Sequence, residues 1–182
     1  TLFITGCGKD KKVESPSDKV RNYLDSYIHL DDNVLSDLDD MIDDIKDYTS
    51  NQKEKYNKIM KHHYENIEYE IKSENIEDDQ ATVEVEIKVY DYNPIINNEY
   101  DQDDFLDEDG EYDVEKFNDF QLDLLDKVDT KIKYTIIFNL SKQDGIWVIN
   151  EPNDIVKQKI HGIYNYENKE FLCFFIIFNK KV

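Results

Sequence analysis

The sequence contains few of the residues and patterns on which common chemical sites depend. Its 182 residues include only two cysteines, five glycines and three prolines. Two cysteines cannot form a disulfide framework, and the chain has no Gly-rich phosphate loop, Gly-x-Ser-x-Gly elbow, Cys-x-x-Cys pair or His-Glu-x-x-His run. No apolar run approaches the roughly 18 residues that a membrane-spanning helix needs. We therefore expect no cofactor and no transmembrane segment.

Basic residues are also scarce, with 22 Lys and Arg against 42 Asp and Glu, for a formal net charge of −20. A surface of this charge repels phosphate backbones and anionic lipid headgroups, so we expect no nucleic acid partner. The acidity is concentrated in residues 31–47, with a net charge of −7, and in residues 99–126, with a net charge of −12. The rest of the chain is nearly neutral, and its apolar and aromatic residues suffice for the core of one domain.

The N-terminus carries a short motif that predicts attachment to a membrane. Ile4-Thr5-Gly6-Cys7 resembles a bacterial lipobox, the end of a lipoprotein signal peptide, after which the cysteine thiol receives a diacylglyceryl group. We expect residues 1–6 to be the remnant of that signal peptide and residues 7–15 to be the lipidated Cys7 and a hydrophilic tether. The protein would then lie on the extracytoplasmic face of the cell membrane. The alternative is an N-terminal strand with a buried free cysteine.

Apolar residues recur at helical spacing in three segments after the tether. Ser15-Pro16-Ser17-Asp18 is typical of a helix start, with a capping serine followed by proline, and predicts a helix to about residue 30. A second helix is predicted over residues 32–48, with an apolar stripe facing the core. Its aspartates form a solvated face or, alternatively, a docking surface for a basic partner. A third helix begins near Thr49, and its shared face consists of Tyr56, Ile59, Met60 and His63.

The apolar period then changes from 3.6 to 2, which is typical of strands. Residues 67–71 and 81–89 predict an antiparallel hairpin with an acidic turn and one buried face, and residues 132–140 and 147–149 predict a second hairpin. Pro152 is expected to open a last short helix, which Gly162 ends. Between the hairpins, a polar loop leads to a fourth helix, whose buried face is predicted to be Val114, Phe117, Phe120, Leu124, Leu125 and Val128.

Taken together with Cys7, the pattern Gly145-Ile146-Trp147-Val148-Ile149 and the run from Val20 to Ile160 carry a family resemblance. The chain resembles the small secreted lipoproteins of Gram-positive bacteria whose domain is of the nuclear-transport-factor-two-like, or cystatin-like, type. The resemblance implies an α+β fold over residues 16–163, with N-terminal helices packed on a curved antiparallel four-stranded sheet that forms a cone. Two segments depart from it, the acidic insertion at residues 93–129 and the apolar tail at residues 164–182.

A pocket inside such a cone would be lined by aromatic side chains and a histidine, for which the candidates are Tyr69, His63, Phe117, Tyr134 and Trp147. His62 and His63 form the only adjacent imidazole pair, but neighbouring helical residues point in different directions. We therefore expect a packed His63 and a solvated His62. The alternative is a pocket enzyme of the same fold superfamily, with Tyr69 or His63 as the acid–base residue.

The carboxylates of the insertion suggest an acidic interaction surface, for which the candidates are Asp101, Asp103, Asp104, Asp107 and Asp109. Calcium would suit these oxygen ligands, but an alignment of the helix-loop-helix calcium motif on Gly110 places Phe105 where the first ligand belongs. We therefore predict no metal site and expect a solvated, mobile loop. The alternative is that this acidic surface recruits cations or a basic partner.

The tail contains eight consecutive apolar residues, 171–178, followed by Asn179-Lys180-Lys181. As a strand this run would span about 26 Å, and as a helix about 12 Å, which is too short to cross a membrane. An added edge strand, a membrane-contacting segment and an altered reading frame all remain open. For the whole protein we expect a lipid-anchored domain without catalysis that binds a small ligand or a cell-envelope protein.

Overall fold

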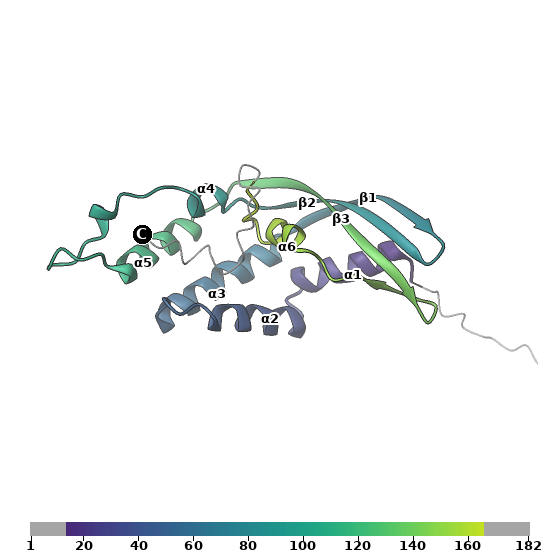
Figure 1. Cartoon of the computed structure of the whole chain (residues 1–182), viewed down its shortest axis with the longest axis horizontal. Coiled ribbons are helices and arrows are strands. Elements are labelled where there is room, and N and C mark those ends of the chain that lie inside the picture. Colours follow the sequence, from purple (N-terminus) through teal and green to yellow (C-terminus); the bar gives the residue numbers. More distant parts are fainter. Residues whose placement is uncertain (1–13, 166–182) are drawn as a thin grey trace, which may run out of the picture.

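The protein combines N-terminal helices with a four-stranded antiparallel sheet in a computed structural model that describes residues 14–165 (Figure 1). Three helices come first, α1 (Pro16–Ile28), α2 (Asp32–Asp43) and α3 (Ser50–Glu65). The hairpin β1 (Glu68–Glu77) and β2 (Gln80–Tyr90) precedes an insertion with α4 (Asn93–Ile96), the 3₁₀ helix η1 (Gln102–Phe105) and α5 (Val114–Leu125). The chain then forms β3 (Lys131–Gln143), β4 (Ile146–Ile149) and α6 (Asp154–Ile160). The predicted α+β class is confirmed, whereas Cys7 and residues 166–182 lie outside the described residues.

Local signals start the first and third helices where the sequence predicts. The Ser15 hydroxyl accepts the backbone N–H of Asp18, and the Thr49 hydroxyl accepts that of Gln52. In both caps a side-chain oxygen of the third helical residue accepts the backbone N–H of the capping residue, so that two otherwise unpaired N–H groups are satisfied.

Helix α2 is shorter than predicted, since it ends at Asp43 and not at residue 48. Its last turn contains no basic residue, and Asp43 and Asp44 lie at the end where the helix dipole is negative. Acidic side chains at this end destabilise a further turn. The apolar stripe nevertheless continues past the helix, because Tyr48 is buried in the core.

The four strands follow the sheet order β1-β2-β3-β4, and all neighbours are antiparallel. Along β2 the side chains alternate between the core and the outer face, as predicted. The β3–β4 turn is formed by Asp144 and Gly145, which have φ values of 51° and 79° and suit the tight turn of a hairpin. Figure 1 shows helices α1, α3 and α6 on one side of the sheet, and the main core lies between these layers.

The predicted start of α6 is wrong, and its predicted end is confirmed. Pro152 does not open the helix, because the side chain of Asn153 caps it by accepting the backbone N–H of Val156. Gly162 does end it, with a φ of 70°. The N–H groups of Gly162 and Ile163 donate to the carbonyls of Lys159 and Gln158, which is the hydrogen-bond pattern of a glycine-terminated helix.

Of the face predicted for helix α5, Leu125 is buried as expected, but the helix packs mainly through other residues. Its buried residues are Asn118, Gln121, Leu122 and Leu125, whereas Val114 and Phe120 are exposed. The reason is that Gln52 of α3 and Asn118 of α5 make hydrogen bonds to groups that are distant in sequence, Gln52 to the Glu115 carbonyl of α5 and Asn118 to the Asp47 carbonyl between α2 and α3. These bonds turn the amide side of α5 toward the domain, and the insertion extends beyond the end of the sheet (Figure 1).

Candidate functional site

The five predicted pocket residues do not meet in one place. Tyr69 and Tyr134 both lie opposite Ile87 and so share a row on the helix-covered face of the sheet. Trp147 lies opposite Lys142, near the β3–β4 turn. His63 belongs to the last turn of α3, and Phe117 lies in the insertion. None of the five lines the shallow surface depression formed around Glu151, Pro152 and Lys157.

The polar atoms of the two tyrosines in this row have partners within the protein. The Tyr69 hydroxyl donates to Oδ1 of Asp25 at 2.6 Å, and the Tyr134 hydroxyl donates to the carbonyl of Tyr164 at 3.1 Å. Partial burial, together with the neighbouring Asp25 carboxylate, raises the pKa of Tyr69 to about 12. Both hydroxyls therefore join elements of the fold, Tyr69 to α1 and Tyr134 to the segment after α6.

His63 is buried and His62 is exposed, as predicted. Nε2 of His63 lies 2.8 Å from the carbonyl of Ile160, so this nitrogen carries the proton and donates it. Nδ1 is buried and has no hydrogen-bond partner among residues 14–165. Burial lowers the pKa of His63 to about 4, because a second proton would place a charge inside the core.

A second histidine completes this buried cluster. The Tyr64 hydroxyl lies 3.0 Å from Nδ1 of His161, which follows α6, and burial lowers the pKa of His161 to about 3. The Tyr27 and Tyr64 rings meet edge to face at 5.1 Å. His63, Tyr64 and His161 thus fasten α3 to α6 in their neutral forms.

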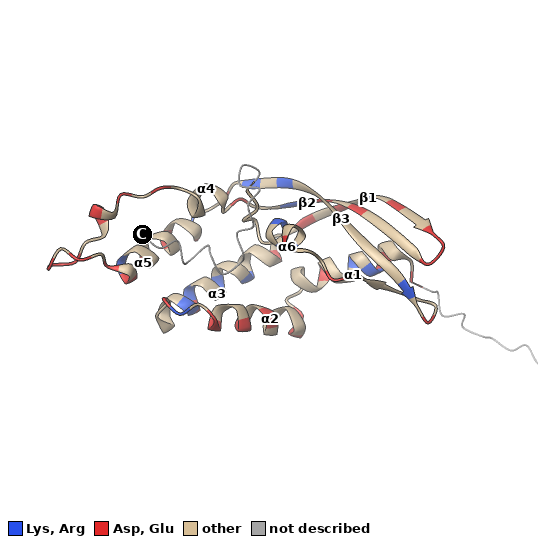
Figure 2. Ribbon diagram, in the orientation of Figure 1, with Lys and Arg blue, Asp and Glu red and all other residues tan. Residues whose placement is uncertain are grey.

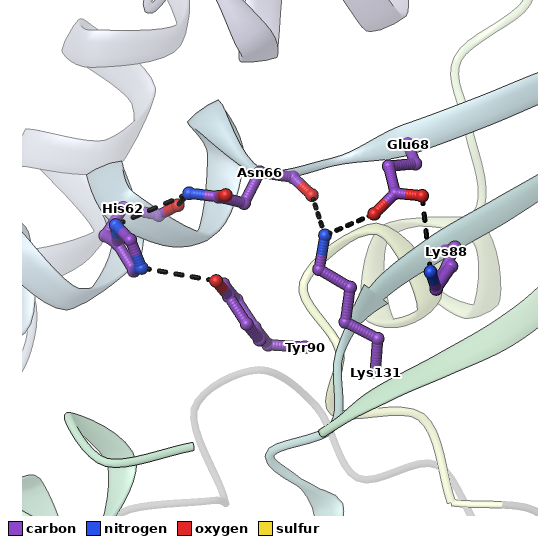
Figure 3. A network of polar contacts seen from close by, with 6 residues as sticks. All are labelled: His62, Asn66, Glu68, Lys88, Tyr90 and Lys131. Carbon is purple, nitrogen blue, oxygen red and sulfur yellow. Dashed lines mark hydrogen bonds and ion pairs between the residues drawn. The ribbon is translucent and has the colours of Figure 1, made fainter. Parts of the chain in front are cut away.

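A polar network lies where α3 meets the sheet (Figure 3). The His62 ring stacks on Tyr90 at 5.5 Å, and its Nε2 lies 3.3 Å from the Tyr90 hydroxyl. Lys131 donates to the carbonyl of Asn66 at 2.8 Å and to Glu68 at 2.6 Å, and its ammonium lies 5.2 Å from the centre of the Tyr90 ring. The hydrogen bond from Lys131 is the main cause that keeps the pKa of Glu68 below its ordinary value. The network joins α3, β1, β2 and β3 and satisfies its own charges.

The acidic insertion is the most strongly charged part of the described surface (Figure 2). Thirteen carboxylates and a single base, Lys116, lie between residues 99 and 126. Among the described residues, Asp123 is the only one of these carboxylates in an ion pair, with Lys55. The Lys116 ammonium instead donates to the backbone carbonyls of Asp104 and Leu106. The negative charge is therefore largely uncompensated.

The five predicted surface aspartates are brought together in this segment, and all are exposed. Two of them stabilise its turns, since Asp101 accepts the N–H of Asp103, and Asp107 accepts those of Asp109 and Glu111. The side chains of Asp103, Asp104 and Asp109 accept no hydrogen bond from the described part of the chain. No group of three or more metal-ligating side chains within residues 14–165 is arranged to hold an ion.

The carboxylates of the predicted loop are exposed to solvent, and aromatic residues pack the loop against α5. Phe105 is only 6% exposed, and its ring lies 5.1 Å from those of both Phe117 and Phe120. Tyr100 covers the same two rings from the other side of the loop, at 5.9 and 5.3 Å. We call Tyr100, Phe105, Phe117 and Phe120 the aromatic cluster. It holds the acidic loop against α5.

Sequence patterns missed the residues that orient the insertion. The Gln52 amide donates to the carbonyl of Glu115 at 3.0 Å and to Asp119 at 2.8 Å, and Asn118 donates to the carbonyl of Asp47 at 2.9 Å. Gln52 and Asn118 are both buried. A glutamine three residues after Thr49 was the available signal for the cap, but nothing local in the sequence indicated its second role across the helix interface.

Comparisons with protein-family models, with curated proteins and with solved structures found no match to this chain. The resemblance to Gram-positive lipoproteins therefore stays a prediction. Within residues 14–165, no helix has both the length and the apolar character to cross a membrane.

Proposed function

We propose that the protein is a lipid-anchored binding domain on the outer face of the bacterial cell membrane. In this proposal Cys7 carries the lipid, and the helices and sheet form a cystatin-like support for the insertion. The insertion contacts a basic surface of a cell-envelope protein, and no catalysis is involved.

The observation that carries the proposal is the uncompensated charge of residues 99–126. Their net charge of −12 has one ion-pair partner among the described residues, Lys55, and the loop that carries it is held by the aromatic cluster. Keeping like charges close together costs stability unless a partner uses them. A surface of this kind accelerates association with a basic partner and selects against acidic ones.

Binding through a surface is better supported than binding in a pocket. The candidate pocket residues are dispersed, and the polar groups of three of them already form hydrogen bonds within the protein. The Tyr69 hydroxyl donates to Asp25, and the Tyr134 hydroxyl donates to the carbonyl of Tyr164. His63 forms a hydrogen bond with the carbonyl of Ile160. A pocket enzyme would need at least one of these groups to face a substrate.

Neutralisation of the acidic surface tests this proposal. The variant Asp103→Asn, Asp104→Asn, Glu108→Gln and Asp109→Asn removes four charges whose side chains accept no hydrogen bond from the described residues. We expect it to recover at least about tenfold less partner from an envelope extract at low salt, and the difference to vanish at high salt. A matched control removes four charges from the α2 region, with Asp32, Asp37, Asp40 and Asp44 each changed to Asn. The proposal would be contradicted if both variants recovered equally reduced amounts of partner, or if the amount recovered did not depend on the salt concentration.

The anchor has a separate test. A Cys7→Ala precursor expressed in a Gram-positive host should leave the membrane fraction and appear in the medium, because it cannot take the acyl chains. Cys173→Ala is the control and should remain membrane-bound. Membrane retention of the Cys7→Ala chain would overturn the lipid anchor without affecting the proposed acidic contact.

A further inference from the structure

An apolar strip remains uncovered on the insertion, beside its acidic loop. The aromatic cluster covers one side of Phe117 and Phe120, but Val114 is 44% exposed, Phe120 37% and Tyr112 36%. Phe117 and Leu124 continue the strip along α5 and are half-buried. We call these five residues the α5 strip, and the four of them that lie within α5 follow helical spacing. An exposed apolar strip of this kind marks an interaction site, and because many carboxylates lie beside it, a segment that binds there should have both apolar and basic residues.

The last described residues, 162–165, lie near the start of the insertion, which begins after β2. The carbonyl of Gly162 accepts the backbone N–H of Tyr92 at 2.9 Å, directly before α4, and α4 packs on α5. Tyr164 then lies against Tyr134, with ring centres 5.8 Å apart. Residues 166–170 can span up to about 17 Å. The segment that follows Asn165 therefore starts within reach of the C-terminal end of α5.

The sequence of that following segment suits the α5 strip in apolar character and charge, and the segment is long enough to cover the strip. Residues 171–178 are all apolar, and Asn179-Lys180-Lys181 follows them. Helix α5 measures about 17 Å from Leu125 to Val114, and eight extended residues reach about 26 Å. A chain that runs outward along α5 would place its lysines near Asp107 and Asp109. The reverse direction would place them at the nearly neutral base of the insertion.

We propose that residues 171–178 of this chain dock along the α5 strip and that Lys180 and Lys181 pair with the acidic loop. The segment covers Val114 and Phe120 and partly neutralises residues 99–126 from within the same molecule. This inference does not depend on the proposed partner or on the lipid anchor, because every group that it uses belongs to this chain.

Cross-linking of the full chain tests the docking directly. In a Cys7→Ala background, Cys173 is the only native thiol, and Leu124→Cys adds a second thiol on the α5 strip. Mild oxidation at low protein concentration should join residues 173 and 124 within one chain. A matched control uses Ile137→Cys, which is on the outer face of β3, where Ile137 is 52% exposed. We expect at least about tenfold less cross-link there, since burial of a single large apolar side chain changes an equilibrium by more than tenfold.

A second measurement keeps the Leu124 side chain intact. Maleimide should label Cys173 slowly in the Cys7→Ala chain and at least about tenfold faster after Phe120→Asp or after Lys180→Glu with Lys181→Glu. Ile137→Asp is the control and should leave the rate unchanged. The Lys180 and Lys181 changes leave every residue of the described range 14–165 intact.

Three results would overturn the docking. Equal cross-linking at residues 124 and 137 would show that the segment has no preferred site. Cross-links between chains that increase with concentration would assign the α5 strip to a second copy. Protection of Cys173 that appears only with phosphatidylglycerol vesicles would assign residues 171–178 to the membrane surface.

Discussion

Acid should destabilise this protein in part through one ring nitrogen, Nδ1 of His63. Nε2–H of the ring already donates to the Ile160 carbonyl at 2.8 Å. A second proton must therefore bind to Nδ1, which is buried without a hydrogen-bond partner among the described residues. The folded protein accepts this proton only at low pH, because the resulting charge has lost its water and gained no acceptor.

The size of the effect follows from the difference in pKa between the two states. The pKa of His63 is about 4 in the folded protein and has an ordinary value of 6.5. Above pH 6.5 neither state binds the proton, and stability is unaffected. As the pH falls below 6.5 the unfolded chain binds it first, so stability is lost progressively down to about pH 4. The loss attributable to His63 is about 2 kcal/mol at pH 5 and about 3 kcal/mol at pH 4.

Urea unfolding at pH 7.5 and pH 5.0 measures this loss when wild type is compared with His63→Gln. The glutamine amide can donate to the Ile160 carbonyl but does not titrate. The carboxylates and His161 are present in both proteins, so the comparison removes most of their contributions, apart from the part of the His161 shift that is due to His63. We expect the free energy of unfolding of the variant, relative to wild type, to increase by about 2 kcal/mol between pH 7.5 and 5.0.

His62→Gln is the matched control, because His62 precedes His63 on the same helix and is exposed. Its difference from wild type should be nearly independent of pH. If the difference between wild type and His63→Gln were the same at both pH values, His63 would not be the acid-sensitive group and the argument from its unpaired nitrogen would fail.

Two further substitutions test the packing around the insertion. Gly162→Ala should cost at least about 3 kcal/mol in urea unfolding, because its Cβ would lie 2.0 Å from the Tyr90 carbonyl oxygen at a φ of 70°. Gly145→Ala, at a φ of 79° with no atom within 4 Å, should cost only about 1 kcal/mol, and equal losses would refute the clash. Gln52→Leu should cost about 2–3 kcal/mol and speed amide exchange in α5, because it leaves the Thr49 N–H unpaired and removes the hydrogen bonds to the Glu115 carbonyl and to Asp119. Gln143→Leu, on the exposed end of β3, should change stability by less than about 0.5 kcal/mol, and an equally large loss there would exclude a specific role for Gln52.

Helix starts, strand periods and turns could be predicted because each depends on neighbours in the chain. The caps at Ser15 and Thr49 use hydrogen bonds between residues three positions apart. The alternation in β2 fixes which side chains face the core, and Asp144-Gly145 fixes the second hairpin turn. The buried His63 and exposed His62 follow from the helical period alone.

The orientation of α5 could not be predicted in this way. Its sequence contains an apolar stripe through Phe117 and Phe120 as well as the mixed face through Asn118 and Leu122, and periodicity favours the apolar one. In the structure the mixed face is buried against α3, and Phe117 and Phe120 pack in the aromatic cluster. The choice depends on Gln52 and Asp47, which are 63 and 71 positions away from their partners in α5.

The same division holds for the protein as a whole. The sequence by itself determined the α+β class, the strand pairing of each hairpin and the concentration of negative charge in residues 31–47 and 99–126. Only the tertiary structure decided that the candidate pocket residues lie apart, that the acidic loop is anchored and that an apolar strip on α5 stays uncovered. The physical reason is that hydrogen bonds and apolar periods act over a few residues, whereas burial is decided by groups that folding brings together from distant positions.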